Sequence, residues 1–190
     1  MRRMLLAVLA AAGIAGAAPA QESENVLVVE IEGAAKGTVE IELLPEVAPL
    51  HAERLRRLAR EGAYDGVVFH RVIDGFMAQT GDVEHGTVDA FAAGRAGTGG
   101  SSLPDLPAEF SGVSFEAGVV GMARSQSPDS ANSQFFIMFA PAPHLNGQYT
   151  VVGRVIAGQD VVDAIRRGTG PNGAVAEPDR MARVRVKSDL

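Results

Sequence analysis

The sequence predicts a mainly β fold, a closed antiparallel barrel whose ends are covered by two α-helices. Three observations predict it: several short β-branched segments, frequent Gly and Pro residues between them, and only two segments with helical periodicity. The chain has 190 residues, 46% of them hydrophobic and 21% charged, which fits one globular domain with a sizeable core. We place this domain at residues 21–190.

The first 20 residues are expected to be a secretory signal peptide outside the fold. A basic start at Arg2-Arg3 precedes an apolar stretch, and Ala18-Pro19-Ala20 offers a small-residue cleavage site. The apolar stretch is short for a membrane span of about 20 residues. Cleavage would leave a periplasmic protein with no stable membrane insertion, and the alternative is an uncleaved N-terminal anchor.

The first element of the mature chain is expected to be a β-hairpin. Residues 26–31 form a β-branched run, and Val39, Ile41 and Leu43 alternate with glutamates, as in a strand with one buried face. Glycines punctuate the link between the two segments. At the other end of the chain, Val184 and Val186 alternate with basic residues and predict a last strand.

Two helices interrupt the strands. Pro49 suits the first position of a helix, and residues 50–60 contain strong helix formers with Leu55 and Leu58 on one side, before Gly62. A second, shorter helix is expected at residues 159–167, where Gly168 would end it.

Residues 86–107 are expected to form a long loop, because they are rich in Gly, Ala, Ser and Asp. The loop contains Gly97-Thr98-Gly99-Gly100, but the Lys-Ser/Thr pair of a phosphate-binding loop is missing. Nucleotide binding is therefore not expected.

Composition excludes further classes of function. The formal charge is −6, and cleavage after Ala20 leaves 15 basic and 23 acidic residues, a charge of −8, which is unsuited to nucleic acid. The absence of cysteine excludes disulfides and thiolate chemistry. No compact metal-ligand spacing joins the four histidines, so a metal site is not expected; they are His51, His70, His85 and His144. We expect a monomer.

Two segments carry a specific resemblance. Residues 69–82 read FHRVIDGFMAQTGD, and residues 121–153 read GMARSQSPDSANSQFFIMFAPAPHLNGQYTVVG. Both resemble the cyclophilin-type peptidyl-prolyl cis–trans isomerases, particularly bacterial members, and the resemblance runs in order over nearly the whole mature chain. It implies a closed eight-stranded barrel with two capping helices. It also implies catalysed rotation about Xaa-Pro bonds, which needs no cofactor, with proline-containing peptides and folding exported proteins as partners.

The resemblance places Arg71 and Gln79 at catalytic positions. Rotation about an Xaa-Pro bond breaks no covalent bond, but it passes through a twisted amide with a barrier of about 20 kcal/mol. A permanently charged guanidinium can donate a hydrogen bond to the nitrogen lone pair that the twist releases. Glutamine amides can donate to a substrate carbonyl while accepting from Arg71. The substrate-binding positions that the resemblance implies are Phe76, Met77, Gly97, Ala123, Arg124, Gln134, Phe136, His144, Leu145 and Tyr149.

The neighbouring aromatic residues Phe69 and Phe135 are assigned to the core instead, because side chains alternate across a strand. At Arg124 only the backbone groups are carried over from the family. His144 and Tyr149 stand where many eukaryotic relatives have a tryptophan and a histidine. The replacement at His144 predicts weak cyclosporin binding.

A non-catalytic peptide-binding or chaperone module is the alternative to an enzyme. Such a module could keep the apolar pocket without a cation beside it. The presence of Arg71 together with Phe76, Gln79 and Phe136 favours the enzyme.

Overall fold

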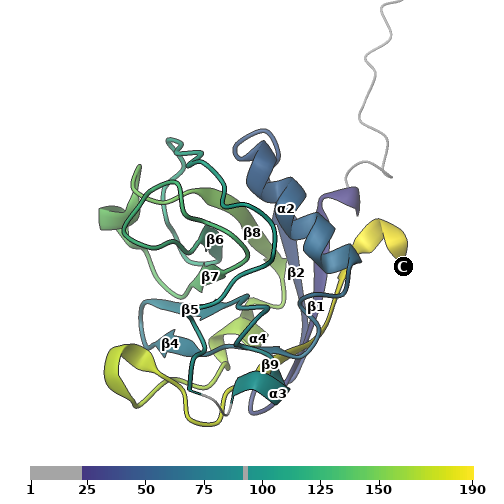
Figure 1. Ribbon diagram of the computed structural model, residues 1–190, viewed down its shortest axis with the longest axis vertical. Coiled ribbons are helices and arrows are strands. Elements are labelled where there is room, and N and C mark those ends of the chain that lie inside the picture. Colours follow the sequence, from purple (N-terminus) through teal and green to yellow (C-terminus); the bar gives the residue numbers. More distant parts are fainter. Residues whose placement is uncertain (1–22, 92–93) are drawn as a thin grey trace, which may run out of the picture.

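The computed structural model describes residues 23–91 and 94–190. One nine-stranded sheet curls around the core, and helix α2 lies along its outside (Figure 1). All paired strands are antiparallel, in the order β3-β9-β1-β2-β8-β6-β7-β5-β4. The strands are β1 (Val26–Glu32), β2 (Gly37–Leu43), β3 (Val67–Val68), β4 (Arg71–Ile73), β5 (Met77–Thr80), β6 (Val119–Met122), β7 (Phe135–Met138), β8 (Val151–Ala157) and β9 (Arg180–Val186).

The expected N-terminal hairpin and last strand are confirmed as β1, β2 and β9. The signal peptide expected at residues 1–20 lies outside the described residues. Within the described part of the chain, no helix is long and apolar enough to cross a membrane.

The closed barrel of eight strands is not what the structure shows. The sheet ends at β3 and β4, and no ladder joins these two strands in the described residues. Residues 168–175 occupy the outer edge of β4 instead: Gly168 N–H donates to Val72 O, and Val175 N–H donates to His70 O. The sheet is therefore curled but open between its end strands.

Three α-helices lie wholly within the described residues, where two are expected. They are α2 (Pro49–Arg60), α3 (Val88–Phe91) and α4 (Gln159–Asp163). The chain also forms the short 3-10 turns η1 (Pro143–Leu145), η2 (Pro171–Gly173) and η3 (Lys187–Asp189). Helix α2 is confirmed with its proline start. Helix α3 interrupts the segment expected to be a loop, because four residues are too few to show a period.

Helix α4 ends four residues before the predicted end. The N–H of Arg166 donates to the buried carboxylate of Asp179 at 2.7 Å and not to a helix carbonyl. The chain is thus drawn out of the helix by a residue from the start of β9, well before Gly168.

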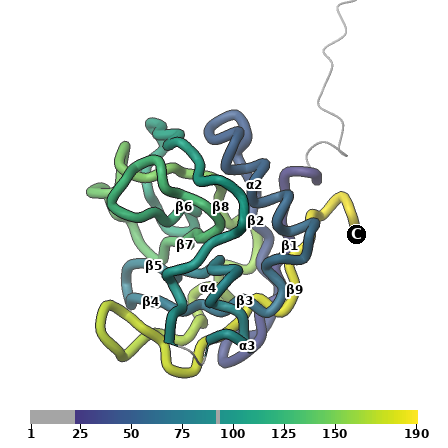
Figure 2. The backbone as a smooth tube through the Cα atoms, viewed as in Figure 1, coloured from purple at the N-terminus to yellow at the C-terminus, as the bar shows by residue number. Residues whose placement is uncertain are grey.

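The core forms two separate clusters. The larger lies inside the curled sheet and contains Phe69 and Phe135, as expected from strand alternation. The smaller cluster lies beneath the β5–β7 region and contains Met77, Phe136 and Leu145. Residues 94–118, which precede β6, run across the front of the molecule in Figure 2.

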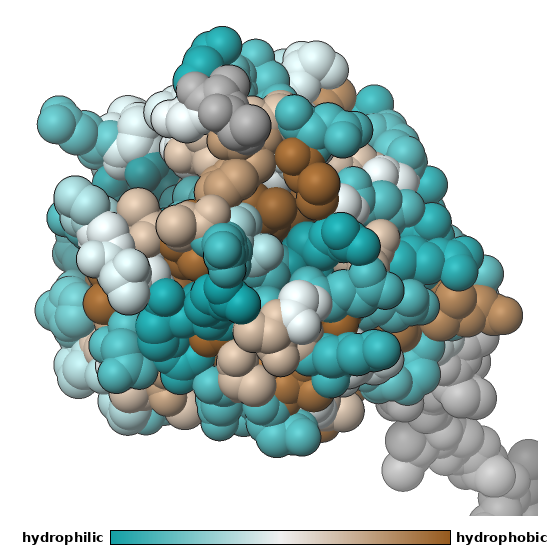
Figure 3. All heavy atoms as spheres, turned by 90° about the horizontal axis from the view of Figure 1, so that it is seen from below, coloured by the Kyte–Doolittle hydropathy of each residue, from teal (hydrophilic) through white to brown (hydrophobic). Residues whose placement is uncertain are grey.

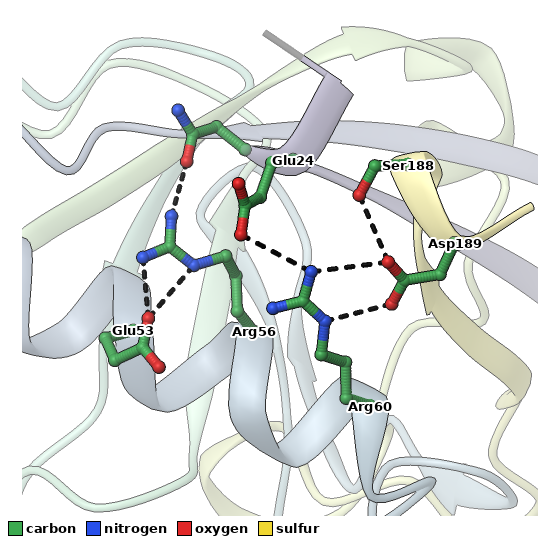
Figure 4. Close-up of polar contacts among 7 residues, drawn as sticks. Glu24, Glu53, Arg56, Arg60, Ser188 and Asp189 are labelled. Atoms are coloured by element: carbon green, nitrogen blue, oxygen red, sulfur yellow. Dashed lines mark hydrogen bonds and ion pairs between the residues drawn. The ribbon is translucent and has the colours of Figure 1, made fainter. Parts of the chain in front are cut away.

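The exposed face of α2 is tied to both ends of the described chain. Arg60 donates to Asp189 in η3 and pairs with Glu24, and Arg56 donates to Glu53 one turn earlier (Figure 4). This helix is therefore fixed to the sheet by apolar residues on one side and to the termini by charged residues on the other.

Candidate active site

Two adjoining hollows share part of their lining. The smaller has a volume of about 160 Å³ and the larger about 500 Å³. Gln79, Ala123 and Arg124 line both. The two hollows therefore form one continuous candidate site with an apolar and a polar part.

The smaller hollow has an apolar floor. Met77 of β5, Phe136 of β7 and Leu145 of η1 are buried there as members of the smaller core cluster. Phe76 and Tyr149 complete its lining, and the Tyr149 ring meets Phe136 edge-on. Such a surface can hold a flat aliphatic ring without requiring hydrogen bonds.

Arg71 brings a positive charge to the side of this apolar hollow. It lies opposite Gln79 in the β4–β5 ladder, and its Nη1 donates to Gln79 Oε1 at 3.0 Å. Its Nε donates to the backbone carbonyl of Asn172 at 3.0 Å. Partial burial lowers the pKa of Arg71 from its ordinary value, but an arginine remains protonated in a protein. The site thus has a fixed, oriented cation.

A row of amides continues from Arg71 into the larger hollow. Gln79 Nε2 donates to Gln134 Oε1 at 3.0 Å, and Gln134 Nε2 donates to Gly99 O at 2.8 Å. Because each amide accepts at its oxygen and donates at its nitrogen, the row fixes the orientation of both glutamines. One N–H of each amide group remains for a ligand.

Buried Asp82 holds the Gly97–Gly99 side of the larger hollow. Its carboxylate accepts from the N–H groups of Gly97 and Gly99, and also from those of Glu84 and His85. Burial alone would raise the pKa of Asp82, but the four donors outweigh burial and lower it. A charged carboxylate therefore organises this wall.

The opposite wall of the larger hollow depends on Asn132. Its side chain accepts from Ser101 and donates to Leu103 O and Asp105. Buried Arg54 of α2 donates from behind to Asn132 O and Pro104 O. The two segments that form the wall are thus joined to each other and to α2.

The Arg124 side chain fixes the rim between the two hollows. Its guanidinium lies 4.4 Å from the Tyr149 ring centroid and donates to the backbone carbonyls of Gln148 and Ser125. The side chain therefore has a place in the site, although only its backbone groups are carried over from the family.

The structure places every expected site residue except His144 in the lining of one or both hollows. Nine of them line the smaller hollow, and Gly97 and Gln134 line the larger. His144 lines neither, but its ring stacks on Phe76 with centroids 5.7 Å apart. In residues 23–91 and 94–190, no three His, Asp or Glu side chains lie close enough together to hold one metal ion.

Sequence reasoning missed three residues that shape the site. Asp82 and Asn132 lie within the two segments that carry the family resemblance. Their side chains bind backbone groups far away in the sequence, and no local pattern predicts such contacts. Asn172 precedes a glycine, and an Asn-Gly pair is a sign of left-handed turn geometry. That signal points to a turn but not to its contact with Arg71.

The chain is similar in sequence to known proteins. The family described as cyclophilin type peptidyl-prolyl cis-trans isomerase/CLD matches residues 26–186. A probable peptidyl-prolyl cis-trans isomerase of Brucella suis is 54% identical over 179 residues, covering 93% of this chain and 90% of the relative. Peptidyl-prolyl cis-trans isomerase B of Bacillus subtilis is 41% identical over 131 residues, covering 68% and 84%.

The fold agrees with that of a solved relative. Cyclophilin AquaCyp293 from Hirschia baltica superposes with a TM-score of 0.73 at 28% identity, covering 88% of this chain and 76% of the other. The chain therefore belongs to the cyclophilin-type peptidyl-prolyl cis–trans isomerase family and is an isomerase.

Proposed function

We propose that the chain accelerates rotation about Xaa-Pro bonds of exported proteins by a non-covalent mechanism in which Arg71 stabilises the twisted amide. The observation that carries this proposal is the Arg71 guanidinium beside the apolar hollow, held there by Gln79. Proline-containing peptides are the substrates, and unfolded or folding exported chains are their natural source.

In this mechanism the proline ring occupies the smaller hollow, on Met77, Phe136 and Leu145. As the amide twists, its nitrogen loses conjugation and its lone pair accepts a hydrogen bond from Arg71. The amide groups of Gln79 and Gln134 hold a substrate carbonyl on the side of the polar hollow. The twisted form gains more from these groups than the planar form does, and this difference lowers the barrier.

Several features support the choice of substrate and location. A cyclophilin of Cryptosporidium parvum with the same fold, at 22% identity and a TM-score of 0.71, has been solved in the presence of the dipeptide Ala-Pro. The N-terminal segment has the composition of a signal peptide, which supports a periplasmic location. Weak cyclosporin binding follows from His144, which offers a smaller ring than tryptophan at the rim.

The first experiment is cis–trans exchange of a short Ala-Pro-Phe peptide, measured by NMR with the mature protein and with Arg71→Ala. We expect fast exchange with the wild type and a loss of about tenfold or more with the variant, equivalent to about 1.4 kcal/mol of barrier. Circular dichroism should show that the variant remains folded, because Arg71 lies at an edge strand.

The matched control is Arg57→Ala, which removes an exposed arginine paired with Glu61 on α2, away from the site. Its exchange rate should equal that of the wild type. If folded wild-type protein binds the peptide without accelerating exchange, the catalytic proposal fails and a peptide-binding module remains.

A further inference from the structure

We infer that the loop of residues 168–175 positions Arg71 for catalysis through the backbone carbonyl of Asn172. The inference rests on the proposed function of the same site. It adds a positioning residue that comes from a segment 101 residues further along the chain.

The contact depends on an unusual backbone conformation. Asn172 has φ 54°, and it is the one non-glycine residue with positive φ in the part of the chain that the structure describes. Gly173 follows with φ 78°. Two consecutive left-handed residues turn the Asn172 carbonyl towards Arg71, and its oxygen accepts from Nε at 3.0 Å. Residues held in sparsely populated conformations cluster at functional sites.

The loop is attached to β4 on both sides of Arg71. The N–H of Gly168 donates to Val72 O at 2.9 Å, and the N–H of Val175 donates to His70 O at 3.1 Å. Ala174 forms an isolated antiparallel bridge with Arg71 itself. The loop thus covers the strand edge on which Arg71 lies, and it cannot shift without disturbing this residue.

The fit between loop and strand is close at Gly173. A Cβ atom there would lie 2.5 Å from Ile73 Cγ1 and 2.9 Å from Val72 O. At the start of the loop, Arg167 donates to Asp74 at 3.0 Å and lies over the Phe139 ring. The Arg167 side chain therefore anchors the start of the loop. Near the end of the loop, the lack of a side chain at Gly173 lets the backbone lie close to β4.

The consequence for Arg71 is a fixed guanidinium plane. Nε is held by Asn172, and Nη1 is held by Gln79. Two separated donors of a rigid planar group fix its orientation, so the remaining N–H groups point in a constant direction at the hollow. The acceptor is a main-chain atom, so the requirement at position 172 is the left-handed conformation, which Asn adopts more readily than most residues.

The test compares Gly173→Ala with wild type in peptide exchange measured at several substrate concentrations. The added methyl should push the loop off β4, lower kcat about tenfold and leave KM within about twofold, because the apolar hollow is unchanged. The ¹⁵N resonance of Arg71 Nε should move towards that of free arginine. This signature reports the hydrogen bond independently of activity.

Two further variants sharpen the test. Asn172→Gly preserves the left-handed conformation and should retain the Arg71 Nε resonance, whereas Asn172→Val disfavours that conformation and should shift it. Asn172→Val also replaces Gly173→Ala if the latter does not fold. Glu177→Gln, at an exposed residue paired with Arg166, is the control with unchanged activity.

A folded Gly173→Ala or Asn172→Val variant with wild-type kcat and an unshifted Nε resonance would overturn the inference. If the wild type shows no catalysis but the Nε resonance responds to both substitutions, the positioning contact stands and the proposed function fails.

Discussion

At the scale of single residues, the site depends on polar side chains whose partners are backbone groups. Asp82 accepts hydrogen bonds from four backbone N–H groups. Asn132 bonds the backbone of Ser101 and Leu103 in the wall of the larger hollow, and Arg71 donates to the backbone carbonyl of Asn172. Asp82 and Asn132 fix the backbone that forms the hollows. Their effect on activity is therefore transmitted through shape, and substituting them should first reduce stability.

Asp82→Asn should destabilise the fold by about 2–4 kcal/mol at pH 7, because an amide cannot accept from all four buried N–H groups. The pKa of Asp82 is lowered in the folded state. Its contribution is therefore complete above the unfolded-state pKa of about 3.9 and is lost as the pH falls through the lower folded-state value. Urea unfolding at pH 7 and pH 3 measures both effects.

The difference in the free energy of unfolding between Asp82→Asn and the wild type should thus be smaller at pH 3 than at pH 7. Asp129→Asn, at an exposed aspartate outside this cluster, is the matched control and should change stability by less than about 0.5 kcal/mol. An equal loss for Asp82→Asn at both pH values would show that the charge of the carboxylate is not what stabilises the loop.

At the scale of helices and strands, the sequence predicted the elements that depend only on neighbouring residues. The start of α2 at Pro49 and the hairpin of β1 and β2 follow from residue types and alternation alone. The early end of α4 does not, because it depends on Asp179, a residue 16 positions further along. The N-terminus of α2 also depends on a distant residue, because its cap residue, Ala48, makes no side-chain hydrogen bond to the helix.

The distant Glu109 completes that N-terminus. Its carboxylate accepts from the N–H groups of Leu50 and His51 and from His51 Nδ1 at 2.6 Å. Burial lowers the pKa of His51, which favours the neutral ring. A carboxylate at this position also compensates the positive end of the helix dipole.

Glu109→Ala should therefore lower the free energy of unfolding by about 1–3 kcal/mol, because two helix N–H groups and a buried imidazole lose their acceptor. Glu53→Ala on the exposed face of α2 is the control, with an expected change below about 0.5 kcal/mol. Chemical denaturation of both variants measures the difference. Equal values would show that water replaces Glu109 without loss.

At the scale of the whole molecule, the prediction of a mainly β fold is confirmed, but the prediction of a closed eight-stranded barrel is wrong. The β-rich composition, the two main helices and the site motifs were sufficient for the family, which the comparisons confirm. The missing β3–β4 ladder was not predictable, because residues 168–175 compete for the β4 edge and carry no strand pattern. Competition between segments that are far apart in the sequence cannot be recognised in the local residue pattern of either segment.

The protein without residues 1–20 should be a monomer in solution. In residues 23–91 and 94–190, the large exposed apolar side chains lie on different segments, at Leu50, Val88, Phe110, Ile156 and Leu190. On the face shown in Figure 3, apolar patches are bordered by hydrophilic residues. A single charge sign in excess also disfavours self-association. Light scattering after size-exclusion chromatography should give the monomer mass at micromolar concentration, and a dimer mass would contradict this prediction.

The division of the core into two clusters bears on how such a site can evolve. Met77, Phe136 and Leu145 belong at once to the smaller cluster and to the floor of the apolar hollow. A mutation that reshapes this floor must also repack the cluster, so new preferences for the ring itself would reduce stability. The polar hollow is built largely from glycines, serines and amides. Drift in substrate choice is therefore expected to begin at the exposed side chains of this hollow, such as Thr98 and Ser125, whose substitution leaves the buried cluster unchanged.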